Sequence, residues 1–403
     1  MHCMISLPRW HSNVTNGHTA CSSEGLQNED MAAVSITLQA GSNPPGVRFM
    51  LQQYHERCKS EIVALRTKHA GLVAKGVALP ASQREQEQAA AAACVETNMV
   101  ALRVLLRLEA APAGVLPARL LPVEESASDT SLSLYDDLEQ VLLHVARDWS
   151  DEAATLNADR YRIVRAVAHL VPPVVEHGAP RRRILVLGSG LGRMAFELCK
   201  RGYDIDAVDA SLAMTLAAAT MSDWAATKPN PPTLRCHPWF LRSANLRDTA
   251  ARFQKVVAPG KEAPLPTAPA PAPAPAPQPQ PSWIAGECNL DTVCKTTLHR
   301  ESHFTSPQLH FSHGRFPGPA EMPEAQTHDC VVSHFFIDAV LEDLTIVVDA
   351  VARALKTGGI WHCLGPLKWQ QAPGRPASSF YSWNEVLLVV AAAGFELMTT
   401  VRA

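Results

Sequence analysis

Several features are absent from this chain of 403 residues, and each absence excludes a class of protein. No apolar run approaches the roughly 20 residues of a membrane-spanning helix, since even Val386 to Ala393 is far shorter. Neither sign of charge dominates: 36 Lys+Arg against 39 Asp+Glu give a formal charge of -3, which disfavours binding to nucleic acid or to anionic membranes. The ten Cys lack the spacing of a disulfide scaffold, and no secretory signal precedes them. We therefore expect a soluble protein of the cytoplasm, with the nucleus as a second location.

Composition and periodicity divide the chain into three parts. Residues 1–44 show no periodicity, and we interpret them as a disordered leader. Residues 45–178 carry apolar side chains at helical spacing, which predicts an N-terminal helical region packed as an antiparallel cap, with its first helix broken near Gly71. Residues 179–403 have a different pattern and form the third part.

In this third part, short apolar segments alternate with helical ones. Ile184 to Leu187 is a continuous apolar run closed by Gly188, as expected of a strand that is buried on both faces. The alternation predicts a doubly wound α/β fold with a Rossmann-like parallel sheet.

A Pro-rich tract at about 258–282 cannot form helix or inner strand and is predicted to be an insertion. We count residues 291–326 largely as a further insertion. The remaining predicted elements are helix 194–201, strand 205–208, helix 212–224, strand 330–336, helix 344–355, strand 360–364 and a last strand at 395–401.

The first strand leads directly into Gly188-Ser189-Gly190-Leu191-Gly192 at the start of a helix. Glycines let the backbone approach a ligand closely, and Asp209 at the end of the second strand can accept both hydroxyls of a ribose. This pairing predicts a nucleoside ligand. The alternative without a ligand is that the glycines form a tight turn from strand to helix and that Asp209 is an exposed acid at the end of a strand. The dinucleotide fingerprint requires glycine where Arg193 stands, which disfavours NAD.

Gly-x-Gly-x-Gly followed by an acidic end of the second strand resembles the class I S-adenosylmethionine-dependent methyltransferases. More of the chain resembles one family within that class, the carnosine N-methyltransferases, over roughly residues 46–403 without the Pro-rich insertion. The matching segments are Arg147-Asp148-Trp149-Ser150, Pro238-Trp239 with Asn245, Asp329-Cys330-Val331, Phe335-Phe336-Ile337-Asp338, Gly358-Gly359-Ile360-Trp361 and Leu364-Gly365-Pro366-Leu367.

The resemblance implies methyl transfer from S-adenosylmethionine to an imidazole nitrogen of carnosine or a related small His-containing peptide. By the same resemblance Asp338 contacts the acceptor imidazole, and Gln370 stands where the family has an acceptor-binding His. The cofactor-binding residues that it implies are Gly188, Gly190, Gly192, Arg193, Asp209, Glu287, Phe335 and Arg160.

Several positions depart from the family pattern. The family's Arg aligns with Asn157, so Arg160 is taken as its substitute. The family's acid near the adenine corresponds to either Glu287 or Arg315, and we prefer Glu287 because it keeps the charge. In the class, a seventh, antiparallel strand follows the sixth in sequence and lies between the fifth and the sixth in the sheet. The sequence shows no such strand after the predicted sixth strand, so either the chain is truncated at its C-terminus or another segment fills this slot.

These departures leave three functions open: methylation of a His-containing peptide, methylation of a protein histidine, and cofactor binding without catalysis. The spacing of Cys288, Cys294, His299 and His303 does not favour a zinc site, so no metal is expected. The sequence leaves a homodimer open.

Overall fold

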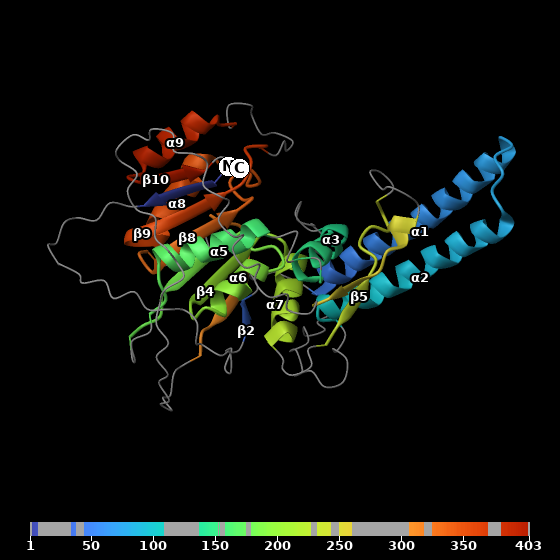
Figure 1. Cartoon of the computed structure of the whole chain (residues 1–403), viewed down its shortest axis with the longest axis horizontal. Helices are drawn as coiled ribbons and strands as arrows, with labels where there is room; N and C mark the ends of the chain where they lie inside the picture. Colours follow the sequence, from blue (N-terminus) through green and yellow to red (C-terminus); the bar gives the residue numbers. More distant parts are fainter. Residues whose placement is uncertain are drawn as a thin grey trace, which may run out of the picture.

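The structure is a computed structural model of the whole chain (Figure 1). It describes residues 2–6, 34–37, 44–108, 137–151, 153, 158–174, 179–226, 232–242, 250–259, 306–317, 325–369 and 380–401. Among these residues, no helix has both the length and the apolar composition that a bilayer crossing requires.

An eight-stranded sheet forms the centre of the fold, in the order β10-β1-β9-β8-β3-β4-β7-β2. Strand β1 is antiparallel to both of its neighbours, and the other strands run parallel to one another. This confirms the predicted Rossmann-like α/β class. The bounds are β1 His2–Ser6, β2 Val34–Thr37, β3 Arg183–Leu187, β4 Asp204–Asp209, β7 Leu309–His313, β8 His328–His334, β9 Leu355–Leu364 and β10 Glu396–Val401.

Both faces of this sheet are buried, as the apolar runs predict. Along β3, Ile184 and Val186 join one hydrophobic cluster, whereas Leu185 and Leu187 join the cluster on the opposite face. This alternation follows from the pleat, which directs successive side chains to opposite sides. The site-bearing strands are therefore held between two apolar layers.

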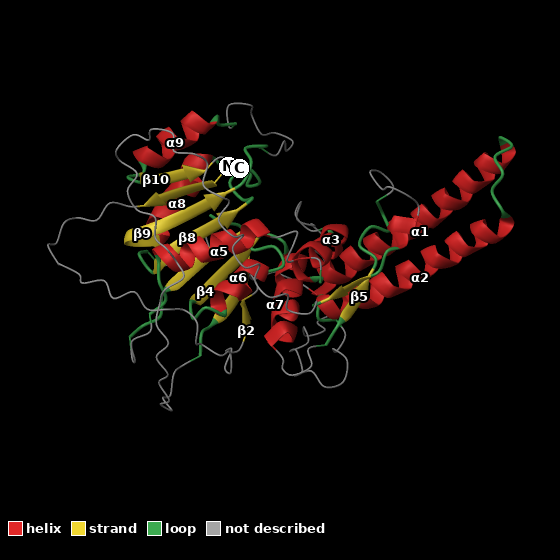
Figure 2. Cartoon of the chain, in the orientation of Figure 1, coloured by secondary structure: helices red, strands yellow, loops and turns green. Residues whose placement is uncertain are grey.

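Helices cover the two faces of the sheet (Figure 2). The first cluster combines β3 and β4 residues with helices α5 (Ala158–Leu170), α6 (Arg193–Cys199) and α7 (Leu212–Ala226). The second cluster combines residues of β8 and β9 with α8 (Leu344–Ala354) and α9 (Trp383–Ala392). Helix α9 begins with a capping box, in which Ser382 and Glu385 satisfy each other's backbone amides.

Two predicted unstructured segments contribute strands, and both predictions were wrong for these residues. Strand β7 lies within residues 291–326, which we counted largely as insertion, yet it pairs in parallel with β4 from Ile205 to Asp209. Strand β2 lies within the predicted leader and pairs with β7 at the edge of the sheet. The polar His310, Ser312 and His313 gave β7 a weak apolar signal, but Leu309 and Phe311 are fully buried. Of the predicted Pro-rich insertion at about 258–282, residues 260–282 lie outside the described residues.

The predicted leader also contains β1, which lies between β9 and β10 (Figure 1). Its register places His2 to Ser6 opposite Leu364 to Ile360 on one side and opposite Val401 to Glu396 on the other. This is the slot of the antiparallel strand that the C-terminal sequence does not supply. Another segment, β1, thus fills this position, as one of the two explanations proposed.

Two long helices, α1 (Pro44–Ala74) and α2 (Ala81–Leu105), form an antiparallel hairpin that extends away from the sheet (Figure 1). The predicted break near Gly71 is absent, because Gly71 continues the helix and the chain turns at Gly76. Asn98 anchors the hairpin: its amide donates to the Tyr54 hydroxyl and to the His237 carbonyl, and it accepts from the His237 amide. The predicted cap is thus an arm beside the sheet, joined to the short strands β5 (Leu234–Cys236) and β6 (Val256–Ala258).

Candidate functional site

The glycine turn between β3 and α6 has a backbone that favours glycine. Gly188 and Gly190 have φ of +62° and +55°, in the left-handed region that side chains rarely adopt. A Cβ on Gly188 would lie 2.8 Å from the Phe336 ring, and one on Gly190 would lie 3.6 Å from His144 Nδ1. The turn is therefore closely bordered by groups from α3 (Leu138–Trp149) and from the segment after β8. Gly192 begins α6 and packs against Phe311.

Asp209 lies beside this turn, as its spacing predicts. Its Oδ2 accepts from the Gly190 amide at 2.7 Å, and its Oδ1 accepts from the Ser211 amide at 2.9 Å. These bonds fix the carboxylate at the carboxyl end of β4, next to β3. A carboxylate can accept about four hydrogen bonds, so its orientation is compatible with further donors such as ribose hydroxyls.

A buried carboxylate flanked by two arginines lies at the end of α3. Asp148 is 1% exposed and pairs with Arg147 Nε at 2.6 Å and Arg160 Nη1 at 2.7 Å. Burial raises the pKa of Asp148, but Arg160 and Arg147 outweigh burial and hold that pKa at about 2. The group carries one surplus positive charge, which suits the carboxylate of a ligand. Arg160, predicted to bind the cofactor, is thus one of its two cations.

Two largely buried histidines, His144 on α3 and His334 at the end of β8, join this cluster. Burial and Arg147 lower the pKa of His144 to about 4. Burial, with Arg160 and Arg147, lowers the pKa of His334 to about 3. Both rings are therefore neutral at neutral pH.

The segment that follows β8 carries two of the predicted site residues, Phe335 and Asp338. Phe335 has φ of +54° and a 54% exposed side chain, and its amide donates to the Leu364 carbonyl at 2.7 Å. Backbone strain at an exposed aromatic residue is often found at binding sites. Asp338 is buried and its Oδ2 accepts from the Lys368 amide at 3.0 Å. Both residues lie at the carboxyl edge of the sheet, where ligands of open α/β folds bind.

The guanidinium of Arg193 has a packing role. It lies 4.9 Å from the centre of the Trp149 ring and pairs with Glu197 at 2.8 Å. These contacts join α3 to α6, so a cofactor contact at this position would come from its backbone. Arg193 was predicted from the sequence as a cofactor residue without this distinction.

The segment after β7 contains Arg315, the alternative to Glu287 in the sequence analysis. Gly314-Arg315-Phe316 follows β7 directly, and the Gly314 amide donates to the Asp209 carbonyl at 2.9 Å. Arg315 therefore lies in a segment that is tied to the carboxyl end of β4. We preferred Glu287 because it keeps the charge, and that preference led us to count residues 291–326, which contain β7, largely as insertion. Glu287, Asn157 and Gln370 lie outside the described residues.

Ligand-binding capacity at the turn is indicated by buried polar atoms that the protein does not satisfy. Ser189 Oγ and His334 Nε2 have no hydrogen-bond partner among the described residues. Such atoms are rare in folded proteins unless a ligand or water pairs with them. The residues therefore fit a polar nucleoside with a charged tail.

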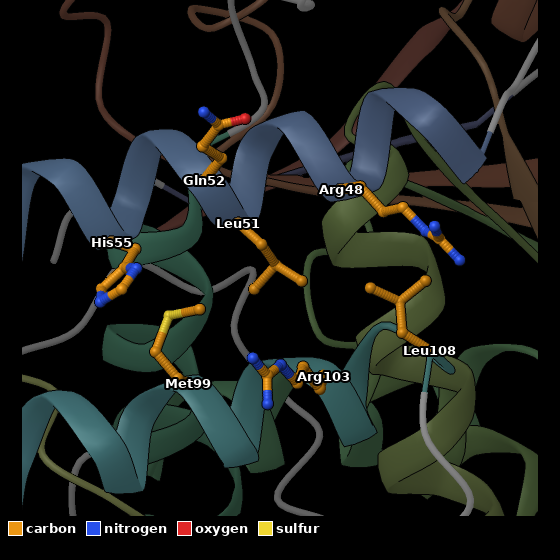
Figure 3. A pocket seen from close by; sticks show the side chains of 7 residues that line it. All are labelled: Arg48, Leu51, Gln52, His55, Met99, Arg103 and Leu108. Carbon is orange, nitrogen blue, oxygen red and sulfur yellow. The ribbon is translucent and has the colours of Figure 1, made fainter. Parts of the chain in front are cut away.

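A separate cleft of about 360 Å³ lies between α1 and α2, and Figure 3 shows the side chains around it. None of its residues is a predicted site residue, and the lining contains no nucleophile beside a base. The chemistry is therefore assigned to the glycine turn. The cleft is lined by Arg48, Leu51, Gln52, His55, Met99, Arg103 and Leu108.

The sequence interpretation assigned no role to His144, Arg147, Asp148 or His334. Arg147 and Asp148 were noted only as part of a motif, because their pairing with Arg160 depends on how α3 and α5 pack. His334 had a usable signal: it lies close to the carboxyl end of the parallel strand predicted at 330–336, at the edge where ligands bind. Within the described part of the chain, no group of His, Cys, Asp or Glu side chains is arranged to hold a metal.

Comparison with known proteins adds a family match and several relatives. The family model for carnosine N-methyltransferase matches residues 125–402. The chain is 24% identical to the carnosine N-methyltransferase of Rattus norvegicus over 65% of this chain and 55% of the relative. It is 20% identical to that of Dictyostelium discoideum over 59% and 43%, respectively. The chain thus spans about half the length of the curated relatives it matches.

Solved structures give looser likenesses. Phosphoethanolamine N-methyltransferase 2 of Haemonchus contortus, in complex with S-adenosyl-L-methionine, has a TM-score of 0.29 and 13% identity, over 58% of this chain and 36% of that one. A TehB-like methyltransferase from Corynebacterium glutamicum has a TM-score of 0.25 and 14% identity, over 60% and 82%. With scores this low, the fold assignment rests on the strand order.

Proposed function

Because the chain belongs to the carnosine N-methyltransferase family, we propose that it transfers a methyl group from S-adenosylmethionine to an imidazole nitrogen of carnosine or a related His-containing peptide. The observation that carries the proposal is the joint placement of the glycine turn, Asp209 and Asp338 at one edge of the sheet. The family match alone would name the reaction without locating it.

Two groups of described residues are suited to two regions of the cofactor, the ribose and the amino-acid tail. Asp209 and the backbone of Gly188 and Gly190 border the proposed place for the ribose. The Arg147–Asp148–Arg160 group supplies the positive charge that a carboxylate tail requires. This arrangement supports binding of a nucleoside that carries an amino-acid tail.

Asp338 is the residue proposed to orient the acceptor. Its Oδ2 is held by the Lys368 amide, and Oδ1 has no partner among the described residues. Oδ1 can therefore accept the N–H of one imidazole nitrogen. The other nitrogen then presents its lone pair, and the carboxylate also stabilises the imidazolium product.

The bound cofactor supplies an electrophilic methyl group on a sulfonium, so the protein needs to align the reactants and exclude water. A neutral imidazole is already a nucleophile, and its ordinary pKa of about 6.5 leaves it mostly neutral at pH 7. Alignment alone can lower a barrier by several kcal/mol. No side chain acting as a nucleophile or strong base is required.

The direct test is methyl transfer to carnosine by the full chain, followed by mass spectrometry of the product. Asp338→Asn keeps the size of the side chain but loses the charge that holds the imidazolium, so kcat/KM should fall by about 100-fold. Asp349→Asn is the matched control, because Asp349 is an exposed acid on α8. Equal activity of the two variants would remove Asp338 from the site.

Gln370 favours a second candidate function, which is cofactor binding without catalysis. An amide can hydrogen-bond to an acceptor but cannot titrate as the family's His does. Under this alternative the chain binds S-adenosylmethionine, leaves carnosine and His-containing proteins unmethylated, and gains activity in Gln370→His. Methylation of a protein histidine in place of carnosine would instead point to a larger acceptor.

A further inference from the structure

His334 carries a buried nitrogen that the protein leaves unpaired. Its Nε2 is shielded from solvent and has no hydrogen-bond partner among the described residues. The ring is held in place by Phe335, whose ring centre lies 4.4 Å away. A fixed, buried and unsatisfied nitrogen at the ligand edge of a sheet indicates a binding group.

The charged groups around His334 keep its ring neutral. Arg147 and Asp148 face it from α3, Arg160 faces it from α5, and His362 is nearby on β9. Burial and the two arginines disfavour a proton on the ring more than Asp148 favours one, and the pKa falls to about 3. A neutral ring with its proton on Nδ1 presents Nε2 as a hydrogen-bond acceptor.

The neighbouring acceptors are already engaged. Arg147 and Arg160 use the Asp148 oxygens, and His144 Nδ1 lies 3.3 Å from Arg147 Nη2. Among the side chains named in this paragraph and His334, the Nε2 atom of His334 therefore remains as an acceptor for a cationic ligand group. The surplus charge of the arginines, by contrast, suits an anion.

We propose, as an extension of the proposed function, that His334 Nε2 accepts a hydrogen bond from the α-ammonium group of the cofactor's amino-acid tail, while Arg147 and Arg160 supply the charge for its α-carboxylate. The cluster thus recognises the tail as a zwitterion. In this role His334 is a cofactor-binding residue.

The test compares ligands that share the nucleoside and differ in the tail. S-adenosylhomocysteine has the full tail, its deaminated analogue keeps only the carboxylate, and 5′-methylthioadenosine has neither group. Titration calorimetry of the full wild-type chain should give about tenfold weaker binding for the deaminated analogue than for S-adenosylhomocysteine, as expected for loss of a hydrogen bond to a charged group. Equal affinities for these two ligands would overturn the proposal without any variant.

Two variants locate the effect at His334. His334→Phe should weaken S-adenosylhomocysteine about tenfold and leave 5′-methylthioadenosine within about twofold. His334→Gln should retain most of the affinity, since its amide oxygen can accept. Equal weakening of both ligands by His334→Phe would indicate a merely structural role and overturn the proposal.

The pH dependence gives an independent readout. Because the pKa of His334 is about 3, wild-type affinity for S-adenosylhomocysteine should stay level between about pH 5.5 and 8, whereas an ordinary histidine would titrate near 6.5. A fall in affinity below pH 6.5 that His334→Gln abolishes would contradict a neutral acceptor. If the wild type binds none of the three nucleosides, the proposed function fails as well.

Discussion

Replacing Asp148 with Asn should destabilise the protein by a magnitude that follows from its environment. Lowering a carboxyl pKa from 3.8 to about 2 corresponds to about 2 kcal/mol of native-state stability at pH 7. Because the pKa is depressed in the folded state, this stabilisation is present above about pH 4 and is lost as the pH falls toward 2. Asn has the shape of Asp, so the loss comes from the charge that holds Arg147 and Arg160.

Urea unfolding followed by circular dichroism measures the difference. At pH 7 the Asp148→Asn variant should unfold with about 2 kcal/mol less stability than the wild type, and the gap should narrow as the pH falls below 4. The control is again Asp349→Asn, whose exposed side chain should change stability by less than about 0.5 kcal/mol. Equal stabilities of the Asp148→Asn variant and the control at pH 7 would refute the assignment of Asp148 as a buried, charge-paired carboxylate.

Three further predictions address the turn, the acceptor and the N-terminal strand. Gly188→Ala should cost clearly more stability than Gly76→Ala in urea unfolding: both positions have positive φ, which costs about 1–2 kcal/mol for Ala, but only Gly188 would press a Cβ against Phe336. For methyl transfer, kcat/KM should rise with pH up to about 6.5 and then level off, because the acceptor imidazole loses its proton there, whereas the pKa values of His144 and His334 are about 4 and about 3; an ionisation between pH 5 and 6 that His144→Gln removes would contradict the burial of His144. Met4→Pro should speed amide hydrogen exchange in β10 relative to β3, since proline removes a donor from a strand that is paired on both sides; unchanged exchange would contradict the placement of β1.

The central strands were predictable because their signal is local. Ile184 to Leu187 and Cys330 to Val332 are apolar on consecutive residues, and that pattern occurs where both faces of a parallel sheet are covered. The glycine turn and Asp209 were equally accessible, since strand adjacency places them together. The structure bears out this juxtaposition, and their contact with the cofactor stays a prediction.

Elements that depend on distant partners escaped the sequence interpretation. Strand β7 alternates apolar and polar residues and follows a long Pro-rich tract, so only its pairing with β4 identifies it. Strand β1 fills a slot between β9 and β10, which lie more than 350 residues later in the chain. The Asp148 cluster likewise joins residues of two helices. Long-range packing, which no local pattern encodes, decides all three.

The central claim is that a nucleoside with a sulfonium lies at the glycine turn with its ribose at Asp209. Calorimetric titration of the full chain with S-adenosylmethionine, beside Asp209→Ala and the Asp349→Asn control, tests it most directly. The account predicts saturable binding that Asp209→Ala weakens at least about tenfold and that Asp349→Asn leaves unchanged. Absence of binding to the wild type, or equal binding to Asp209→Ala, would contradict it.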